Sequence, residues 1–85
     1  MEYVLVAFRS RSHTVSFSEY LRLHGVNNEI VNTPKEAGVG CGLSVKISKN
    51  AFSIVKKAVF GAHYGSFAGF FLVTFYGGVR LVRSI

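Results

Sequence analysis

The one cysteine of the chain, Cys41, lies in a glycine-rich run and is the residue best suited to covalent chemistry. Gly40 and Gly42 flank it, and Gly38 stands three positions earlier. Glycine lets the backbone turn through conformations closed to other residues, and it removes side chains that would shield a thiol from a reactant. We therefore predict that a loop presents this thiol for nucleophilic chemistry.

Positive charge near the thiol decides how readily it reacts. A free cysteine has a pKa of about 8.5, and neighbouring cations or the amino end of a helix lower it by about a unit or more. Backbone N–H groups of a glycine-rich loop, and those at the start of a helix, can also stabilise an anion. The predicted anion-binding residues are Arg9, Arg11, Ser12, Lys35 and Lys46.

Length and composition limit what can surround this site. The chain has 85 residues, of which 49% are hydrophobic and 16% charged, so we expect one folded domain over residues 1–85. A domain this small has little room for a deep, closed active site, which favours a carrier or binding module over a self-sufficient enzyme. We find no catalytic carboxylate–histidine–nucleophile spacing and no phosphate-binding glycine motif, and one thiol is too few for a metal carrier. We expect neither a cofactor nor a metal.

Charge and cysteine usage indicate partners and compartment. The net charge of +6 favours anionic partners, although a solvated basic surface would have the same composition. A lone cysteine excludes an internal disulfide and fits a reducing cytoplasm. The start of the chain lacks the basic region and cleavage site of a signal peptide. We therefore expect a cytoplasmic protein.

The pattern of apolar residues predicts seven elements. Alternation and β-branched or aromatic runs indicate strands, and a stripe with helical spacing indicates each helix. We expect Ser12 to cap the first helix, Ser48 or Asn50 to cap the second, and Gly61 to end the second. In chain order, the expected elements are a strand over 3–8, a helix over 13–24, strands over 28–32 and 43–47, a second helix, a strand over 69–75 and an added strand over 79–83.

This β-α-β-β-α-β order predicts an α+β, ferredoxin-like sandwich, in which two helices cover one face of an antiparallel sheet. The core is expected over 1–75, with a C-terminal extension over 76–85. In this topology the first and third strands are antiparallel neighbours, so the end of one meets the beginning of the other. Arg9 and Arg11 should therefore lie beside the Cys41 loop. His13 is the histidine near this edge; it could exchange a proton with Cys41, but a lone histidine in a first helical turn is more often solvated.

Other functions remain open on the residues alone. Residues 58–79 carry no formal charge and approach the length of a membrane span, but His63, Ser66 and the glycines favour a soluble helix, loop and strand. An RNA-binding module shares the element order, yet the strand over 43–47 lacks stacking aromatics. The last alternative is a non-catalytic partner-binding or regulatory domain. One sheet face cannot readily bury the whole aromatic tail, which suggests a homodimer through the last strands; the tail comprises Phe67, Phe70, Phe71, Phe75 and Tyr76.

The run from Asn32 to Val45, preceded by the strand end Phe8-Arg9-Ser10-Arg11, resembles the selenium/sulfur carrier protein-like family of small bacterial domains. The resemblance implies a ferredoxin-like fold and a persulfide or perselenide on Cys41, which is passed to a partner enzyme. A cysteine desulfurase-like or selenium-activating enzyme is the partner that it suggests. The chain departs from the family in two places: Lys35 stands where arginine is common, and the apolar tail from Leu72 is longer.

Overall fold

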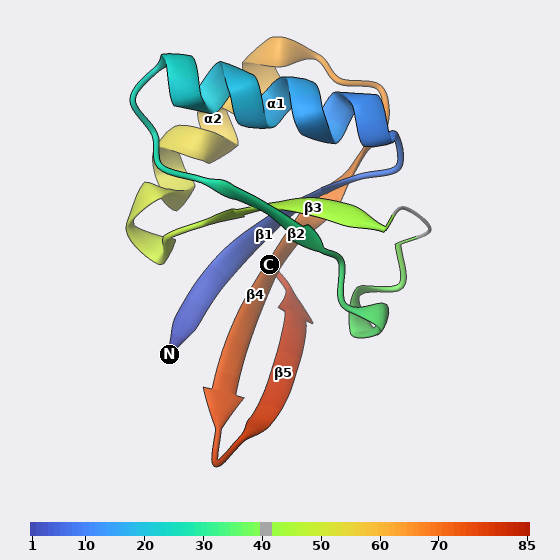
Figure 1. Ribbon diagram of the computed structural model, residues 1–85, viewed down its shortest axis with the longest axis vertical. Coiled ribbons are helices and arrows are strands. Elements are labelled where there is room, and N and C mark those ends of the chain that lie inside the picture. The colour runs from blue at the N-terminus through green and yellow to red at the C-terminus, as the bar shows by residue number, and fades with distance from the viewer. Residues whose placement is uncertain (40–41) are drawn as a thin grey trace.

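The structure, a computed structural model, describes residues 1–39 and 42–85. Gly40 and Cys41 therefore lie outside the described residues. The described part folds into one antiparallel sheet with helical connections (Figure 1). Its elements are β1 (Glu2–Phe8), α1 (Arg11–Leu23), β2 (Glu29–Asn32), the 3-10 helix η1 (Lys35–Ala37), β3 (Leu43–Ile47), the 3-10 helix η2 (Lys49–Ala51), α2 (Phe52–Ala62), β4 (Phe67–Tyr76) and β5 (Val79–Ser84).

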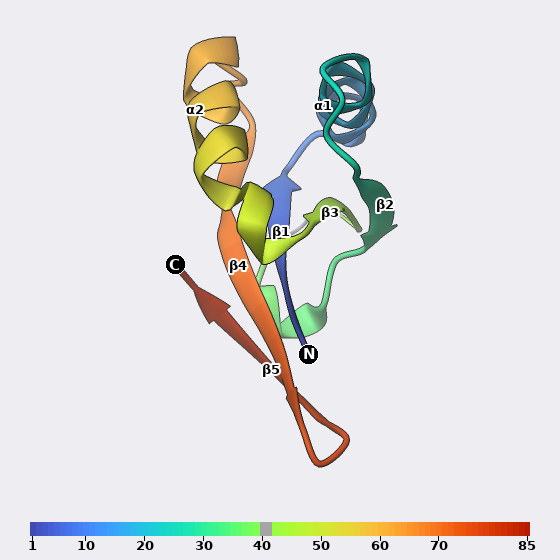
Figure 2. The same cartoon turned by 90° about the vertical axis from the view of Figure 1, so that its left-hand side faces the viewer.

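The strand order β2-β3-β1-β4-β5 confirms the predicted fold class. The first four strands have the ferredoxin-like arrangement, and β5 extends the sheet beside β4 as the added strand. Both helices lie on one side of the sheet, α1 toward β2 and α2 toward β4 (Figure 2). Because every pairing in the described part is antiparallel, β1 and β2 run parallel to each other with β3 between them.

The register of β1 and β3 brings distant parts of the sequence together. Val4 pairs with Ile47 and Ala7 pairs with Ser44, so β1 ends where β3 begins. This pairing confirms the expected juxtaposition of the two strand ends. Gly42, the residue that follows Cys41 in the chain, stands immediately before β3. The register therefore places Gly42 at this end of the sheet.

The main core lies between the sheet and the two helices. Side chains at alternate positions of β1 point toward the helices, as strand geometry requires. Phe8 is 0% exposed, and its ring centroid lies 5.4 Å from that of Phe17 on α1. The buried members of this core are Val4, Val6, Phe8, Phe17, Leu21, Val45, Ile47, Val55, Val59, Phe70 and Leu72.

A second, smaller core covers the opposite face of the sheet. Leu5, Ala7, Phe71 and Val73 are buried there. The side chains packed over them come from β1, β4, the two edge strands β2 and β5, and the connection between β2 and β3: Tyr3, Val31, Ala37, Val39, Ala68 and Val82. The segment that leads to Cys41 is therefore packed against the sheet through Ala37 of η1 and through Val39.

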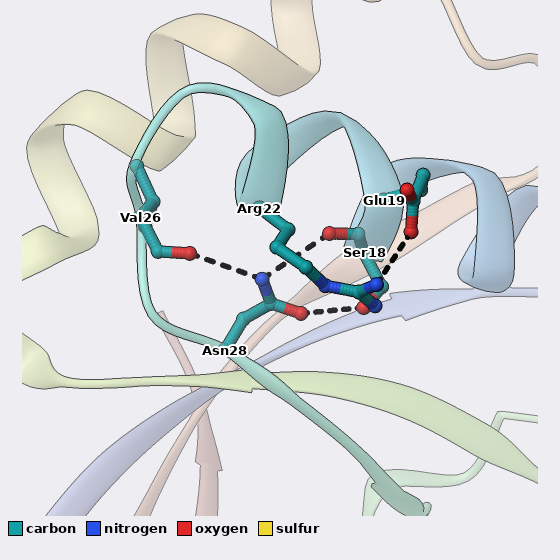
Figure 3. A network of polar contacts seen from close by, with 5 residues as sticks. All are labelled: Ser18, Glu19, Arg22, Val26 and Asn28. Carbon is teal, nitrogen blue, oxygen red and sulfur yellow. Dashed lines mark hydrogen bonds and ion pairs between the residues drawn. The ribbon is translucent and has the colours of Figure 1, made fainter.

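Asn28 joins the end of α1 to the start of β2 (Figure 3). Its side-chain amide donates to the carbonyl oxygens of Ser18 and Val26 at 3.2 and 3.1 Å, and its carbonyl oxygen accepts a hydrogen bond from the Ser18 hydroxyl. Ser18 is only 3% exposed, so its hydroxyl needs such a partner. On the exposed side of the same helix, Arg22 pairs with Glu19 at 2.8 Å.

The start of α1 differs from the prediction. The structure makes Ser10 the N-cap: its backbone is extended, with φ −100° and ψ 125°, and its hydroxyl accepts from the His13 N–H at 3.2 Å. Both serines have the right chemistry, but β1 ends at Phe8, so Ser10 is the serine that still has a non-helical backbone. The prediction that Ser12 caps this helix was wrong, because Ser12 lies within the first turn.

The start and end of α2 also differ from the prediction. Neither Ser48 nor Asn50 accepts a capping hydrogen bond with its side chain, and the 3-10 helix η2 stands before the helix instead. The helix continues past Gly61 to Ala62, and His63 follows in the left-handed conformation at φ 55°. A helix that ends on a left-handed residue needs no glycine when the residue tolerates that conformation, as histidine does.

The C-terminal hairpin agrees with the prediction and is longer. Gly77 and Gly78 have φ of 53° and 82°, the positive values that a two-residue hairpin turn of the I′ type requires. The strand β4 begins earlier than expected because a register shift beside Ala7 and Phe8 accommodates an extra residue, with Gly69 at φ 134°. Such a bulge is invisible in an alternation pattern.

The charge-free segment 58–79 is not one continuous helix. It comprises the end of α2, a turn, β4 and the hairpin turn. Among the helices of the described part, none has both the length and the apolar character that crossing a membrane demands.

Candidate functional site

The loop that contains Cys41 is anchored on both sides. After Cys41, the Gly42 carbonyl oxygen accepts a hydrogen bond from the Thr33 N–H at 2.9 Å, and the Thr33 and Ser44 hydroxyls are 2.6 Å apart. Before Cys41, Gly38 ends η1 in the left-handed conformation, with φ 68°, and its N–H donates to the Lys35 carbonyl oxygen at 3.1 Å. The glycine at 38 thus makes the turn for which it was singled out.

The amino end of α1 lies against the start of β3. Thr14 is fully buried, and its Oγ1 is 3.2 Å from the Ser10 carbonyl oxygen and 3.5 Å from the Leu43 carbonyl oxygen. These contacts join the first turn of the helix to the second residue after Cys41. Thr14 was not among the predicted site residues, because a buried threonine in a helix has no distinctive sequence signal.

The predicted anion-binding residues fall into two groups. Arg9, Arg11 and Ser12 are exposed at the amino end of α1, the end of the sheet where β3 begins. No acidic side chain stands in the first turn of this helix, and neither arginine takes part in an ion pair within residues 1–39 and 42–85. The positive end of the helix dipole and the two guanidinium groups therefore both stabilise an anion at this end of α1.

The two lysines lie elsewhere. Lys35 is exposed at the start of η1, on the segment that leads to Cys41. Lys46 stands near the other end of β3, on the face opposite the helices, where its Nζ lies 4.5 Å from the Tyr3 ring centroid and 3.8 Å from a Glu29 oxygen. The structure therefore does not bring Lys46 to the arginines.

His13 faces the connection between α2 and β4. Its Nδ1 is hydrogen-bonded to the Ser66 hydroxyl, and its ring centroid lies 5.1 Å from that of Tyr64. The backbone N–H of Arg9 donates to the Ser66 carbonyl oxygen at 2.8 Å. These bonds tie the amino end of α1 to the 64–66 turn, which gives His13 a structural role at this end of the sheet.

A forked ion pair joins η1 to β5. Arg80 donates from Nε and Nη2 to the two carboxylate oxygens of Glu36, each at 3.0 Å. This hydrogen bonding from Arg80, together with a backbone hydrogen bond, holds the pKa of Glu36 below its usual value. The pair connects the segment before Cys41 to the last strand, and sequence reasoning missed it because 44 residues separate its members.

Acid should therefore destabilise the protein partly through Glu36. Because its pKa is lower in the folded chain than in the unfolded one, its contribution is present above about pH 4.3, the unfolded value, and is lost as the pH falls through the folded value. We expect Arg80→Gln to lose less stability than the wild type over this acid range. Melting temperatures measured from pH 6 down to about pH 3 test this. Arg83→Gln on the same strand is the matched control, and an acid slope for Arg80→Gln equal to that of the wild type would contradict the assignment.

No three metal-ligating side chains come together among residues 1–39 and 42–85. The family model described as "Putative Se/S carrier protein-like" matches residues 3–64, well over half of the chain. No curated protein and no solved structure matches the sequence. The matched residues include β1, the amino end of α1 and the whole loop around Cys41, and they end before β4. The chain belongs to the Se/S carrier protein-like family.

Proposed function

We propose that the protein carries sulfur or selenium as a persulfide or perselenide on Cys41 and passes it to a partner enzyme. The observation that carries this proposal is the antiparallel pairing of β1 with β3, which brings the start of β3, next to Gly42, to the amino end of α1. At that end, Arg9 and Arg11 form no ion pair within residues 1–39 and 42–85. The family match supports the same assignment. The exposed position of Gly42, next to Cys41 in the chain, fits a site that a second protein must reach.

Loading is a transfer of one neutral chalcogen atom between thiolates. The Cys41 thiolate attacks the terminal sulfur of a persulfide on a donor protein, a new S–S bond forms, and the donor's S–S bond breaks. The donor leaves as a thiolate and Cys41 becomes the persulfide, so no external oxidant or reductant is required. A donor perselenide transfers selenium in the same way, through an S–Se bond. Delivery repeats the exchange with a thiolate on the acceptor.

Both reactive forms of the carrier are anions, which explains the need for positive charge. The attacking species is the thiolate, and a persulfide or perselenide also holds its charge on the terminal atom. Arg9, Arg11 and the first N–H groups of α1 would stabilise both anions more strongly than water does. We propose a reducing cytoplasm as the working compartment, because a single thiol stays available there.

The direct test is intact mass spectrometry. The purified protein is incubated with a cysteine desulfurase and its amino-acid substrate, or with a selenium-activating counterpart, and its mass is recorded with and without a thiol reductant. We expect an added sulfur or selenium that the reductant removes. If no adduct forms and Cys41 is also slow to alkylate, the cysteine is structural and the chain is a partner-binding domain.

Removal of the two arginines should slow the reaction of the Cys41 thiol with an alkylating reagent. We expect Arg9→Ala combined with Arg11→Ala to raise the pKa of Cys41 and to lower its alkylation rate at pH 7 by about fivefold to tenfold. Lys56→Ala with Lys57→Ala, which removes the same net charge from exposed positions on α2, should change the rate much less. The difference should shrink at high salt. Equal rates for the two double variants would rule out activation by the arginines.

A further inference from the structure

The outer edge of β5 presents backbone groups that nothing in the described part of the chain pairs. The two-residue turn makes Tyr76 and Val79 a hydrogen-bonded pair, and the Ile85 N–H donates to the Phe70 carbonyl oxygen at 3.1 Å in the same ladder. Hydrogen bonds in an antiparallel pair alternate, so the odd-numbered residues of β5 bond to β4. The N–H and C=O groups of Arg80, Val82 and Ser84 therefore point away from the sheet.

This edge lacks the features that usually prevent strand pairing. It has six residues, no proline and no register shift against β4. The guanidinium of Arg80 is held by Glu36, which leaves Arg83 as the strand's other charge. The opposite edge of the sheet, β2, is shorter, with four residues, and begins with Glu29. Of the two edges, β5 is the one built to accept another strand.

Apolar side chains accompany the free backbone. Leu81 pairs with Thr74 and Arg83 pairs with Leu72, whose side chain belongs to the core on the helix side. The odd-numbered side chains of β5 therefore stand on the helix side of the sheet, but α2 does not cover them. Val79 is 59% exposed, Leu81 is 50% exposed and Ile85 is 48% exposed. A strand paired with β5 would place its own side chains beside this row, in lateral contact with it.

We infer that the strand that pairs with β5 is β5 of a second copy, related by a two-fold axis at Val82. In this antiparallel register Val82 faces its own counterpart, Leu81 faces Arg83, and Arg80 faces Ser84. Residue 79 then faces residue 85, which matches two apolar side chains. A register centred on Arg80 or on Arg83 would instead oppose like charges, which destabilises a pair. The strand is thus self-complementary, as a two-fold interface requires.

The interface would lie outside the family-matched residues 3–64, in the extension that follows them. Its formation would join the two sheets edge to edge and leave all helices on one face, because a two-fold axis perpendicular to a sheet preserves its faces. The exposed apolar side chains of β5 then have a structural use that a monomer does not give them, whereas Phe70 and Phe71 are already buried in the two cores of one copy.

The test uses Cys41→Ser, so that disulfide-linked species do not count and the result is independent of the proposed carrier function. Sedimentation equilibrium at micromolar concentration should show a dimer. Leu81→Lys places a lysine opposite Arg83 of the other copy and should weaken the dimer about tenfold or more, whereas Leu81→Glu places an opposite charge there and should preserve it. A monomeric parent, or equal weakening by both variants, would overturn the interface or its register.

Val82→Pro tests the backbone contribution. Because the Val82 N–H points outward, proline there removes an intermolecular hydrogen bond and leaves the ladder with β4 intact. We expect a monomer whose far-ultraviolet circular dichroism is native, while Val82→Thr, which keeps the N–H and the branched shape, should remain dimeric. If Val82→Pro proves unfolded, the two Leu81 variants decide the question, because that side chain is outside both cores. A folded Val82→Pro that still dimerises would contradict the proposal.

Discussion

Cys41→Ser should abolish the reductant-labile sulfur or selenium adduct completely. A serine hydroxyl is not ionised near neutral pH and cannot form the S–S or S–Se bond on which the carrier depends. The described anchors of the loop use other groups, namely the main chain of Thr33 and Gly42 and the side chain of Val39. The variant should therefore fold, and intact mass with and without reductant is the measurement.

A second variant tests whether loading depends on the position of the cysteine or only on the presence of a thiol in the chain. Cys41→Ser combined with Asn27→Cys moves the cysteine to an exposed position in the connection between α1 and β2, at the opposite end of α1 from its amino end and at no helix amino end of its own. We expect this relocated thiol to alkylate at the rate of a free cysteine and to load poorly from the same donor. An adduct on Cys41→Ser alone, or equal loading of the relocated thiol, would show that the loop is not the carrier site.

Phe8→Ala should cost about 3–5 kcal/mol of folding free energy, the range measured for deletion of a buried phenylalanine side chain. Phe8 is 0% exposed, and its ring centroid lies 5.4 Å from Phe17, 5.2 Å from Tyr64 and 6.0 Å from Phe67. Those rings come from α1, the 64–66 turn and β4, so the cavity would loosen three segments at once. Because domains of this size are stable by only about 5–15 kcal/mol, much of the population should unfold on mild warming.

Phe75→Ala is the matched control for this core variant. Phe75 is 37% exposed, and its nearest aromatic partner, Tyr3, lies 6.2 Å away between ring centroids. We expect a loss of about 1 kcal/mol or less, measured by urea denaturation followed by circular dichroism. If both variants lost the same stability, the assignment of Phe8 to the centre of the core would be wrong.

Local patterns in the sequence determined the elements, their order and the end of the sheet where the loop is anchored. A continuous run of β-branched and aromatic residues made β1 recognisable, and a period of two made β3 recognisable. A helical stripe located Phe17 and Leu21, and the adjacent glycines at 77 and 78 specified the final hairpin. The element order then limited the topology, because a β-α-β-β-α-β chain has few ways to pair its strands. The proximity of Arg9 and Arg11 to the start of β3 followed from that topology alone.

The tertiary structure decided which groups meet across the sheet. The choice of Ser10 over Ser12 as helix cap depended on where β1 stops, and the separation of Lys46 from the arginines depended on the register that sets its end of β3 beside Leu5 of β1. The Glu36–Arg80 pair and the packing of Val39 over the sheet join segments far apart in the chain. Periodicity specifies the face on which a side chain stands, but the twist of the sheet and the path of a connection over it are properties of the assembled fold.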